Sequence, residues 1–320
     1  LRKTDPDSCP FCPGKESETP PEIFAVRPDS SAPDTPDWSV RVIPNRFPAL
    51  EKSGEIHPAQ PAGLGMRMDG WGVHELVVDS PAHDDGFDRL PVDQIAVTLE
   101  VWKDRMRALQ EDPRIRYVQV FKNHGEAAGA SLSHPHTQIL AMPILPSRIR
   151  REIESFRVHQ EREGSCLVCD LIRQEEGSGD RLVLAEEKFL AWIPYAPRFP
   201  FEILVAPREH LPSFADAGAA TVGQLAKTLK EVFGLYRASL RDPAYNLFLH
   251  TIPNPRFTVP GEGVDSSSAA GPYHWHIEIL PRLTGIGGFE WSTGIHINPM
   301  PPEAAARALR GDGTRLIGNS

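Results

Sequence analysis

The chain has 320 residues, of which 40% are hydrophobic and 24% are charged, and its formal net charge is −9. The length suffices for about two domains of roughly 150 residues each, and the composition is ordinary for a globular protein. The acidic balance argues against a nucleic-acid surface, because such surfaces need clustered Lys and Arg.

Several features of the sequence bear on its compartment. No apolar run approaches the roughly 20 residues that cross a bilayer, and no signal or transit peptide is recognisable. All four cysteines fall into two Cys-x-x-Cys pairs, Cys9 with Cys12 and Cys166 with Cys169. This spacing excludes a secreted disulfide scaffold and favours reduced thiols. We therefore expect a cytoplasmic protein with neither nucleic-acid nor membrane partners. Its first residue is Leu1 rather than Met, so we also expect some native N-terminal sequence to be missing.

Apolar periodicity predicts eight strands and two long helices. One helix has an apolar stripe from Ile95 to Leu109, and the other has a stripe from Val222 to Leu240. Both stripes are interpreted as core faces without chemistry. The strands are expected at residues 40–43, 73–78, 117–121, 137–142, 189–193, 201–205, 245–250 and 274–280.

The two halves of the sequence repeat one order of features: a Cys-x-x-Cys pair, strands, a long helix, and a strand with a His-x-His motif. The motif reads His134-Pro-His136-Thr-Gln138 in the first half and His274-Trp-His276-Ile-Glu278 in the second. The separation is constant, since 274 − 134 = 276 − 136 = 278 − 138 = 140. An internal duplication explains this spacing. It predicts an α+β fold of two tandem domains, residues 1–163 and 164–320, each an antiparallel sheet with a long helix.

Each Cys-x-x-Cys pair predicts half of a tetrahedral metal site, which two histidines near strand ends would complete. Closed Cys2His2 coordination is typical of structural zinc, so we expect two structural Zn2+ ions. The predicted ligands are Cys9, Cys12, His83 and His134 in the first half, and Cys166, Cys169, His210 and His274 in the second. A redox pair is the alternative, but it would sit at a strand-to-helix turn of a βαβ unit, which the pattern lacks. Four other histidines compete as ligands on sequence alone and are expected to be ordinary surface or core residues: His57, His74, His124 and His250.

The first His-x-His motif also predicts a reactive residue. If His134 binds zinc, His136 is free to act as a nucleophile or general base from a rigid strand. Gln138 lies on the same strand face and can donate an amide N–H to an anionic oxygen. Upstream, the small-residue loop around Gly129 allows backbone amides to approach a phosphate closely.

These motifs resemble a known family. His134-Pro-His136-Thr-Gln138, preceded by Phe121-Lys-Asn123 and Gly129-Ala-Ser131, resembles the active-site signature of galactose-1-phosphate uridylyltransferases, which belong to the histidine-triad superfamily. The likeness extends over nearly the whole chain and implies two histidine-triad-like domains. The second half, with its own two cysteines and two histidines, looks similar to the ADP-glucose phosphorylase-type branch.

The resemblance implies roles at individual positions. His136 matches the nucleophile that takes a nucleoside monophosphate onto its ring nitrogen, and the first Cys2His2 group matches the family's structural zinc site. Glu290 matches a contact to a sugar hydroxyl. The positions that match contacts to the nucleotide or its phosphoryl group are Asn45, Asn123, Ser131 and Gln138. The resemblance also implies a homodimer with an active site completed across subunits.

The leading hypothesis is a UDP-glucose:hexose-1-phosphate (galactose-1-phosphate) uridylyltransferase. Its partners would be a nucleotide sugar and a sugar 1-phosphate, and it would work by ping-pong through a nucleotidyl-His136. One alternative is an ADP-glucose or dinucleoside polyphosphate phosphorylase with inorganic phosphate as acceptor; another is a catalytically silent nucleotide-binding zinc protein. Arg46 follows Asn45 where uridylyltransferases often carry Asp. Because Glu278 stands where the first half has Gln138, the second half is expected to lack a transfer site.

Overall fold

The computed structural model describes residues 5–28, 31–52, 60–257 and 271–312. The strands of its main sheet are β1 (Phe24–Val26), β2 (Val40–Pro44), β5 (Val73–Val78), β6 (Tyr117–His124), β7 (His136–Met142), β8 (Leu182–Ala185), β9 (Phe189–Trp192), β10 (Ile203–Pro207), β11 (Tyr245–His250) and β12 (His276–Pro281). A separate hairpin pairs β3 (Gln60–Ala62) with β4 (Gly65–Arg67). The helices are α1 (Val92–Gln110), α2 (Ser147–Glu163), α3 (Leu167–Ser178), α4 (Ala219–Leu240), α6 (Gly288–Thr293) and α7 (Pro302–Arg310).

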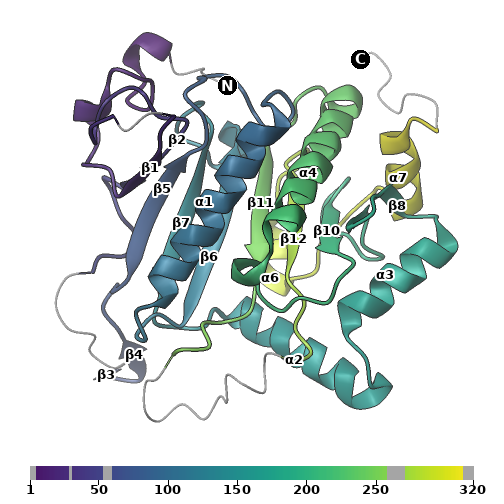
Figure 1. Ribbon diagram of the computed structural model, residues 1–320. Helices are drawn as coiled ribbons and strands as arrows, with labels where there is room; N and C mark the ends of the chain where they lie inside the picture. The colour runs from purple at the N-terminus through teal and green to yellow at the C-terminus, as the bar shows by residue number, and fades with distance from the viewer. Residues whose placement is uncertain (1–4, 29–30, 53–59, 258–270, 313–320) are drawn as a thin grey trace.

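The main sheet is antiparallel and contains two copies of one strand arrangement. Its order is β1-β2-β5-β7-β6-β11-β12-β10-β9-β8, so the first half of the chain forms one side and the second half forms the other. The halves meet where β6 pairs with β11. Each half contributes one long helix to the same face of the sheet, where Figure 1 shows α1 and α4 side by side. The expected α+β tandem repeat is therefore confirmed.

The predicted elements correspond closely to the observed ones. All eight predicted strands and both long helices are present. However, β7 and β12 begin at His136 and His276, so His134 and His274 precede their strands instead of lying on them. The proposed division between residues 163 and 164 stays a prediction.

The helix-covered face of the sheet is the main core. The apolar stripe of α1 is buried there, including Ile95, Leu99 and Trp102, at 0% exposure each, because helical spacing places these residues on one face. Ile139 and Ala141 of β7 belong to the same core. Since side chains alternate along a strand, His136 and Gln138 lie on the opposite face.

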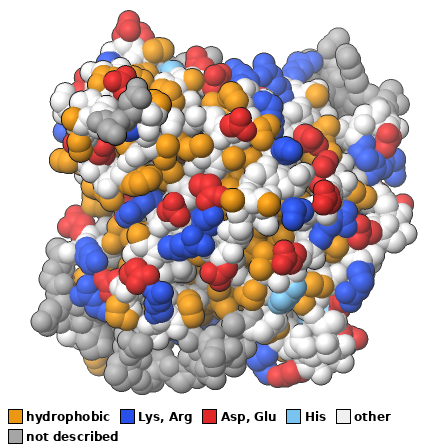
Figure 2. All heavy atoms as spheres, in the orientation of Figure 1, with side chains coloured by type: hydrophobic (Ala, Val, Ile, Leu, Met, Phe, Trp, Pro, Cys, Tyr) orange, Lys and Arg blue, Asp and Glu red, His pale blue; other side chains and the backbone are white. Residues whose placement is uncertain are grey.

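The outer surface of this layer carries charged side chains among hydrophobic ones (Figure 2). Figure 2 shows acidic and basic side chains interspersed over α1 and α4, without an extended area of one sign. Within the described part of the chain, no helix is both long and apolar enough to cross a membrane.

Candidate active site and metal-binding groups

The first Cys2His2 group comes together as the sequence predicts. The ligand atoms of Cys9, Cys12, His83 and His134 all lie within 4.8 Å of one another. The Sγ of Cys12 is 3.2 Å from Nδ1 of His83 and 3.6 Å from Nδ1 of His134. Ligands of a tetrahedral ion with metal–ligand bonds of 2.0–2.3 Å are about 3.5 Å apart, so this group fits one metal ion.

The surroundings of this group orient its imidazoles. Nε2 of His134 lies 2.8 Å from the carbonyl oxygen of Ser80, which can only accept, so Nε2 carries the proton and Nδ1 faces the sulfurs. Burial lowers the pKa of His134 to about 4, which keeps the ring neutral as metal binding requires. Burial and the neighbouring Cys9 raise the pKa of the metal-free Cys12 thiol to about 11. A metal ion must therefore displace a proton from the thiol.

The second Cys2His2 group has the same construction. The ligand atoms of Cys166, Cys169, His210 and His274 also lie within 4.8 Å of one another. Nε2 of His274 is 2.9 Å from the carbonyl oxygen of Pro207, as Nε2 of His134 is from that of Ser80 in the first group. Both predicted groups could therefore each hold a metal ion.

His136 is presented as a neutral nucleophile. Its Nδ1 donates to the carbonyl oxygen of His134 at 2.8 Å, so the lone pair is on Nε2. Burial lowers the pKa of His136, and the side chain is only 6% exposed. The ring of Phe11 packs edge-on against it, with centroids 5.4 Å apart. These contacts fix the ring while its free nitrogen borders a cavity.

A previously unassigned histidine orients Gln138. The backbone N–H of Ala49 donates to Nδ1 of His74 at 3.1 Å, so the proton of this ring is on Nε2. That nitrogen donates to Oε1 of Gln138 at 2.9 Å. Since its oxygen is engaged, the amide of Gln138 offers its N–H groups to a ligand. From the sequence, His74 was expected to be an ordinary surface or core residue. Nothing local in the sequence indicates that β5, which carries His74, pairs with β7, which carries Gln138.

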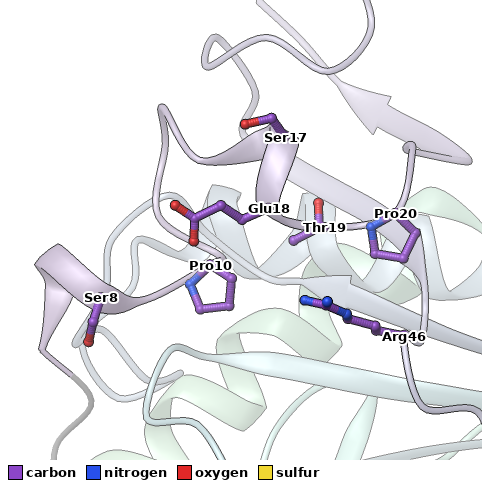
Figure 3. A pocket seen from close by; sticks show the side chains of 7 residues that line it. All are labelled: Ser8, Pro10, Ser17, Glu18, Thr19, Pro20 and Arg46. Atoms are coloured by element: carbon purple, nitrogen blue, oxygen red, sulfur yellow. The ribbon is translucent and has the colours of Figure 1, made fainter.

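The cavity beside His136 has a volume of about 430 Å3. His136, Gln138, Ser131 and Asn45 form its polar end, and apolar residues, including Phe11, form its walls. It continues into a second cavity of about 600 Å3, shown in Figure 3. The two cavities share the lining residues Pro10, Glu18, Thr19, Pro20 and Arg46. The joined space therefore leads away from the nucleophile toward these shared residues.

Asn123 and Gly129 do not line this cavity, and Asn123 lines a separate, smaller cavity of about 90 Å3. Asn123 shares the strand face of His136, and its Oδ1 accepts a hydrogen bond from Nδ2 of Asn246 at 2.8 Å. Gly129 ends the short 3-10 helix Glu126–Ala128 with φ of 85°, a left-handed conformation that glycine adopts readily. Asn246 also donates to the carbonyl oxygen of Ala128 and so secures the loop. The contribution of Asn246, from the second half, was not predicted.

Comparison with known proteins identifies the chain. Residues 2–146 match the N-terminal domain and residues 152–310 the C-terminal domain of galactose-1-phosphate uridyl transferases. The chain belongs to this family. It is 35% identical over 308 residues to ADP-glucose phosphorylase of Arabidopsis thaliana, covering 95% of this chain and 82% of that protein. It is 31% identical over 280 residues to galactose-1-phosphate uridylyltransferase of Thermotoga maritima, covering 86% and 85%.

Solved structures agree with this assignment. The crystal structure of the Arabidopsis thaliana ADP-glucose phosphorylase with bound ADP-glucose superposes with a TM-score of 0.80 at 32% identity, covering 95% of this chain and 89% of that one. A uridylyltransferase mutant superposes with a TM-score of 0.77 at 27% identity, covering 95% and 92%. The protein is therefore a nucleotidyltransferase of the hexose-1-phosphate uridylyltransferase type.

In this uridylyltransferase-family chain, the second half carries an equivalent histidine in a different setting. Nδ1 of His276 lies 3.1 Å from the carbonyl oxygen of His274, as in the first half. Its Nε2, however, is 3.4 Å from Oε1 of Glu152 on α2. Glu152 also contacts His250 at 2.7 Å, and Glu152, His250 and His276 form a third group that could hold a metal ion. The sequence did not predict this group, because its acidic member lies 98 residues from His250.

Glu278 is held by cations. Its Oε2 lies 2.7 Å from Nη2 of Arg148 on α2 and 2.7 Å from Nη2 of Arg198. Burial alone would raise the pKa of Glu278, but the charges of His250, Arg198 and Arg148 lower it to about 2. The position equivalent to Gln138 therefore carries a paired carboxylate under α2, and does not offer a phosphate-binding amide.

The remaining predicted residues lie elsewhere. Glu290 does not line the His136 cavity; its Oε2 accepts from the backbone N–H of Gly287 at 3.1 Å and caps α6. His124 contacts Asp242 at 3.3 Å and stacks on Tyr245. His57 lies outside the described residues.

Proposed function

We propose that this protein is an ADP-glucose phosphorylase, which transfers AMP from ADP-glucose to inorganic phosphate through His136. The observation that carries the transfer chemistry is the Nε2 lone pair of a neutral, backbone-anchored His136 at the polar end of the cavity. The choice of adenylyl transfer is supported by the 35% identity to the Arabidopsis thaliana ADP-glucose phosphorylase over 95% of this chain. This identity places the ADP-glucose phosphorylase ahead of the uridylyltransferase, which was the leading hypothesis from the sequence alone.

The proposed reaction has two displacements. Nε2 of His136 attacks the α-phosphorus, the bond to the glucose 1-phosphate oxygen breaks, and a nucleotidyl-histidine forms. An oxygen of inorganic phosphate then attacks the same phosphorus, and the phosphorus–nitrogen bond breaks to release ADP. The N–H groups of Gln138, oriented by His74, would stabilise negative charge on the phosphoryl oxygens. Asn45, Ser131, Asn123 and the loop at Gly129 would bind the nucleotide and its phosphates.

The nucleobase is expected at the far end of the cavity. If the α-phosphate lies at His136, a nucleoside extends toward Glu18, Thr19 and Arg46, where the two cavities join (Figure 3). A carboxylate and a guanidinium there can accept from and donate to a base. Arg46 replaces the Asp that uridylyltransferases often carry, which is consistent with a base other than uracil.

We further propose zinc in both Cys2His2 groups. Two thiolates and two imidazoles are a donor set that zinc prefers, and all four positions are filled by protein, as in structural sites. Zinc, when bound, fixes the geometry of these side chains. In the first group this would hold His134, whose carbonyl oxygen in turn anchors Nδ1 of His136. Reduced thiols agree with the cytoplasmic location that the sequence predicts.

A homodimer would complete the site. Glu290 lies in a surface segment with several exposed apolar side chains, including Trp291 at 76%, Ile295 at 60% and Ile297 at 63% exposure. Such a cluster is typical of an interface. We propose that this segment packs on a second copy of the chain and places Glu290 near the sugar of its ligand.

The second candidate is galactose-1-phosphate uridylyltransferase, with hexose 1-phosphate as acceptor. The 31% identity to the Thermotoga maritima enzyme, over 86% of this chain, supports it. A catalytically silent zinc protein would bind nucleotide without forming a covalent adduct.

One experiment distinguishes the three. The purified protein is incubated with ADP-glucose or UDP-glucose, and intact-mass and peptide spectra are scored for a nucleotidyl group on His136. We expect adenylylation from ADP-glucose, and glucose 1-phosphate release that requires inorganic phosphate. Uridylylation from UDP-glucose that galactose 1-phosphate discharges would replace the first candidate by the second. If neither sugar nucleotide forms an adduct, the remaining candidate is the catalytically silent zinc protein.

A further inference from the structure

A buried polar group lies directly behind the nucleophile strand, on the helix-covered face of the sheet. Nζ of Lys122 is 2.5 Å from Oδ2 of Asp79, and the two side chains are 2% and 0% exposed. The hydroxyl of Thr137 donates to Oδ1 of Asp79 at 3.0 Å. Lys122 also lies over the ring of Phe87, 5.2 Å from its centroid. Lys122 lies on β6, Thr137 lies on β7, and Asp79 directly follows β5. β7 pairs with both of the other strands.

This group is bonded to the backbone on both sides of the nucleophile. Nζ of Lys122 donates to the carbonyl oxygen of His136 at 3.2 Å. The backbone N–H of Asp79 donates to the carbonyl oxygen of Pro135 at 3.1 Å. From α1, Gln94 and Thr98 donate to the carbonyl oxygen of Asp79. The peptide units that carry His136 are thus connected to the frame of the first half through Asp79 and Lys122.

The second half provides a natural comparison for this group. Thr137 corresponds to Ile277 by the constant 140-residue offset. Phe121 pairs with Gln138 and Phe248 pairs with Glu278, so Lys122, the next residue on β6, corresponds to Leu249 on β11.

The third position follows from the neighbouring strands. Val77 pairs with Thr137, and Val205 pairs with Ile277. Asp79 is two residues beyond Val77, and Pro207 is two residues beyond Val205. The second half therefore has Pro207, Leu249 and Ile277 at the three positions, and all are buried.

The comparison separates folding from function. Burying a lysine and a carboxylate carries a desolvation cost, and apolar replacements of buried ion pairs are often neutral or stabilising. The second half builds the same junction of three strands with apolar side chains alone. The fold therefore does not require the polar group at these positions, and the half that retains it is the half with an open cavity at the histidine.

We propose that Asp79, Lys122 and Thr137 are positioning residues, which hold the backbone of residues 135–137 so that Nε2 of His136 is aligned with the phosphorus it attacks. This inference rests on the proposed nucleotidyl transfer. None of the three borders the His136 cavity, so they act through the backbone. Displacing a reacting atom by about 1 Å can slow a reaction by roughly 100-fold.

The test gives the first half an apolar group like that of the second. The triple variant Asp79→Ala/Lys122→Leu/Thr137→Ile removes both charges together, and Ala keeps the N–H that Pro would remove. We expect kcat to fall by about 100-fold with KM within threefold, and nucleotidyl-His136 to form correspondingly more slowly in a single turnover. Thr137→Val, which removes one hydroxyl, should lower kcat by a smaller factor. This single variant tests the proposal if the triple variant does not fold.

An ion pair of β5, the strand that directly precedes Asp79, is the matched control. Glu75 of β5 pairs with Arg105 of α1 at 2.7 Å, four residues before Asp79. The double variant Glu75→Gln/Arg105→Met should keep kcat within threefold. Equal losses in the control and triple variants, an unchanged kcat in the triple and Thr137→Val variants, or a change in KM alone would each overturn the proposal.

A readout without turnover separates this proposal from the proposed function. Diethyl pyrocarbonate modifies neutral imidazoles, and peptide mass spectrometry gives the rate at His136. If the native protein forms no nucleotidyl adduct, the proposed function fails, and the modification rate still decides the positioning. A changed rate at His136 in the triple variant, with the control like the native protein, supports it; equal rates in all three proteins refute it.

Discussion

The two halves of the molecule carry the same backbone-anchored histidine and differ in what lies beyond its free nitrogen. Nδ1 of His136 and of His276 each contact the carbonyl oxygen two residues earlier, at 2.8 and 3.1 Å. Beyond Nε2, the first half has a cavity of about 430 Å3, and the second has the carboxylate of Glu152. A His-x-His motif on a strand therefore does not make a reactive site by itself; the space in front of it does.

The supporting residues differ in the same way. In the first half, His74 orients the amide of Gln138 and leaves its N–H groups available. In the second, Arg198 bonds both Glu202 and Glu278, which produces a closed set of charges under α2. The equivalent position in the second half is thus part of an ion-pair network that includes Arg148 of α2, while the position in the first half leaves the amide N–H groups of Gln138 for a ligand.

The largest expected difference between the halves concerns the histidines. His136→Asn should lower turnover by at least about 10^4-fold, because the attacking lone pair is lost. His276→Asn, scored per folded molecule, should keep turnover within about threefold. If both Cys2His2 groups hold zinc, as proposed, both variants should keep the zinc content of the native protein by elemental analysis, since neither residue belongs to a Cys2His2 group. A loss of turnover in the His276 variant with zinc and fold intact would contradict the division of roles.

The sequence predicted what short-range patterns can encode. Apolar periodicity gave α1, α4 and eight strands, the 140-residue offset of the His-x-His motifs indicated the duplication, and the Cys-x-x-Cys pairs indicated both Cys2His2 groups. The cysteine spacing was informative because two thiols close in sequence must be close in space. His136 and Gln138 were recognisable because they alternate on one strand.

Contacts between distant segments had no such signal. Nothing local indicates that α2 contacts the second half, where Glu152 meets His250 and His276, or that Asp79 and Lys122 pair 43 residues apart. The role of His74 depends on which strand lies next to β7. These contacts could be identified only from the tertiary structure. They join side chains that are far apart in the sequence and become neighbours only through the packing of the helices and the order of the strands.

A smaller effect is expected from the residue that orients Gln138. His74→Phe removes the N–H donor to Oε1 of Gln138, so the amide can rotate and present its oxygen to the phosphate. We expect kcat to fall by about 10- to 100-fold, less than the loss of an oxyanion donor itself, with KM little changed. His74→Gln keeps an N–H donor and should recover much of the rate. Equal rates for Phe, Gln and the native residue in steady-state assays would show that Gln138 needs no orientation.

The smallest expected effect concerns stability and probes the closed network of the second half. Because the folded-state pKa of Glu278 is lowered to about 2, its ionised form stabilises the fold above its ordinary pKa of about 4.3, and this contribution is lost as pH falls toward 2. Glu278→Gln should therefore lower the free energy of unfolding by roughly 2 kcal/mol at pH 7, measured by denaturant titration.

The difference between Glu278→Gln and the native protein should narrow between about pH 5 and pH 2, since the native carboxylate then takes up a proton as well. Glu154→Gln is the matched control on α2, because the Glu154 side chain is 57% exposed and its ion pair with Arg157 lies in solvent. Glu154→Gln should change the free energy of unfolding by less than about 0.5 kcal/mol at both pH 7 and pH 3. If the Glu278 variant lost the same stability at pH 3 as at pH 7, the loss would come from packing, and the network of paired charges would not be what distinguishes the second half from the first.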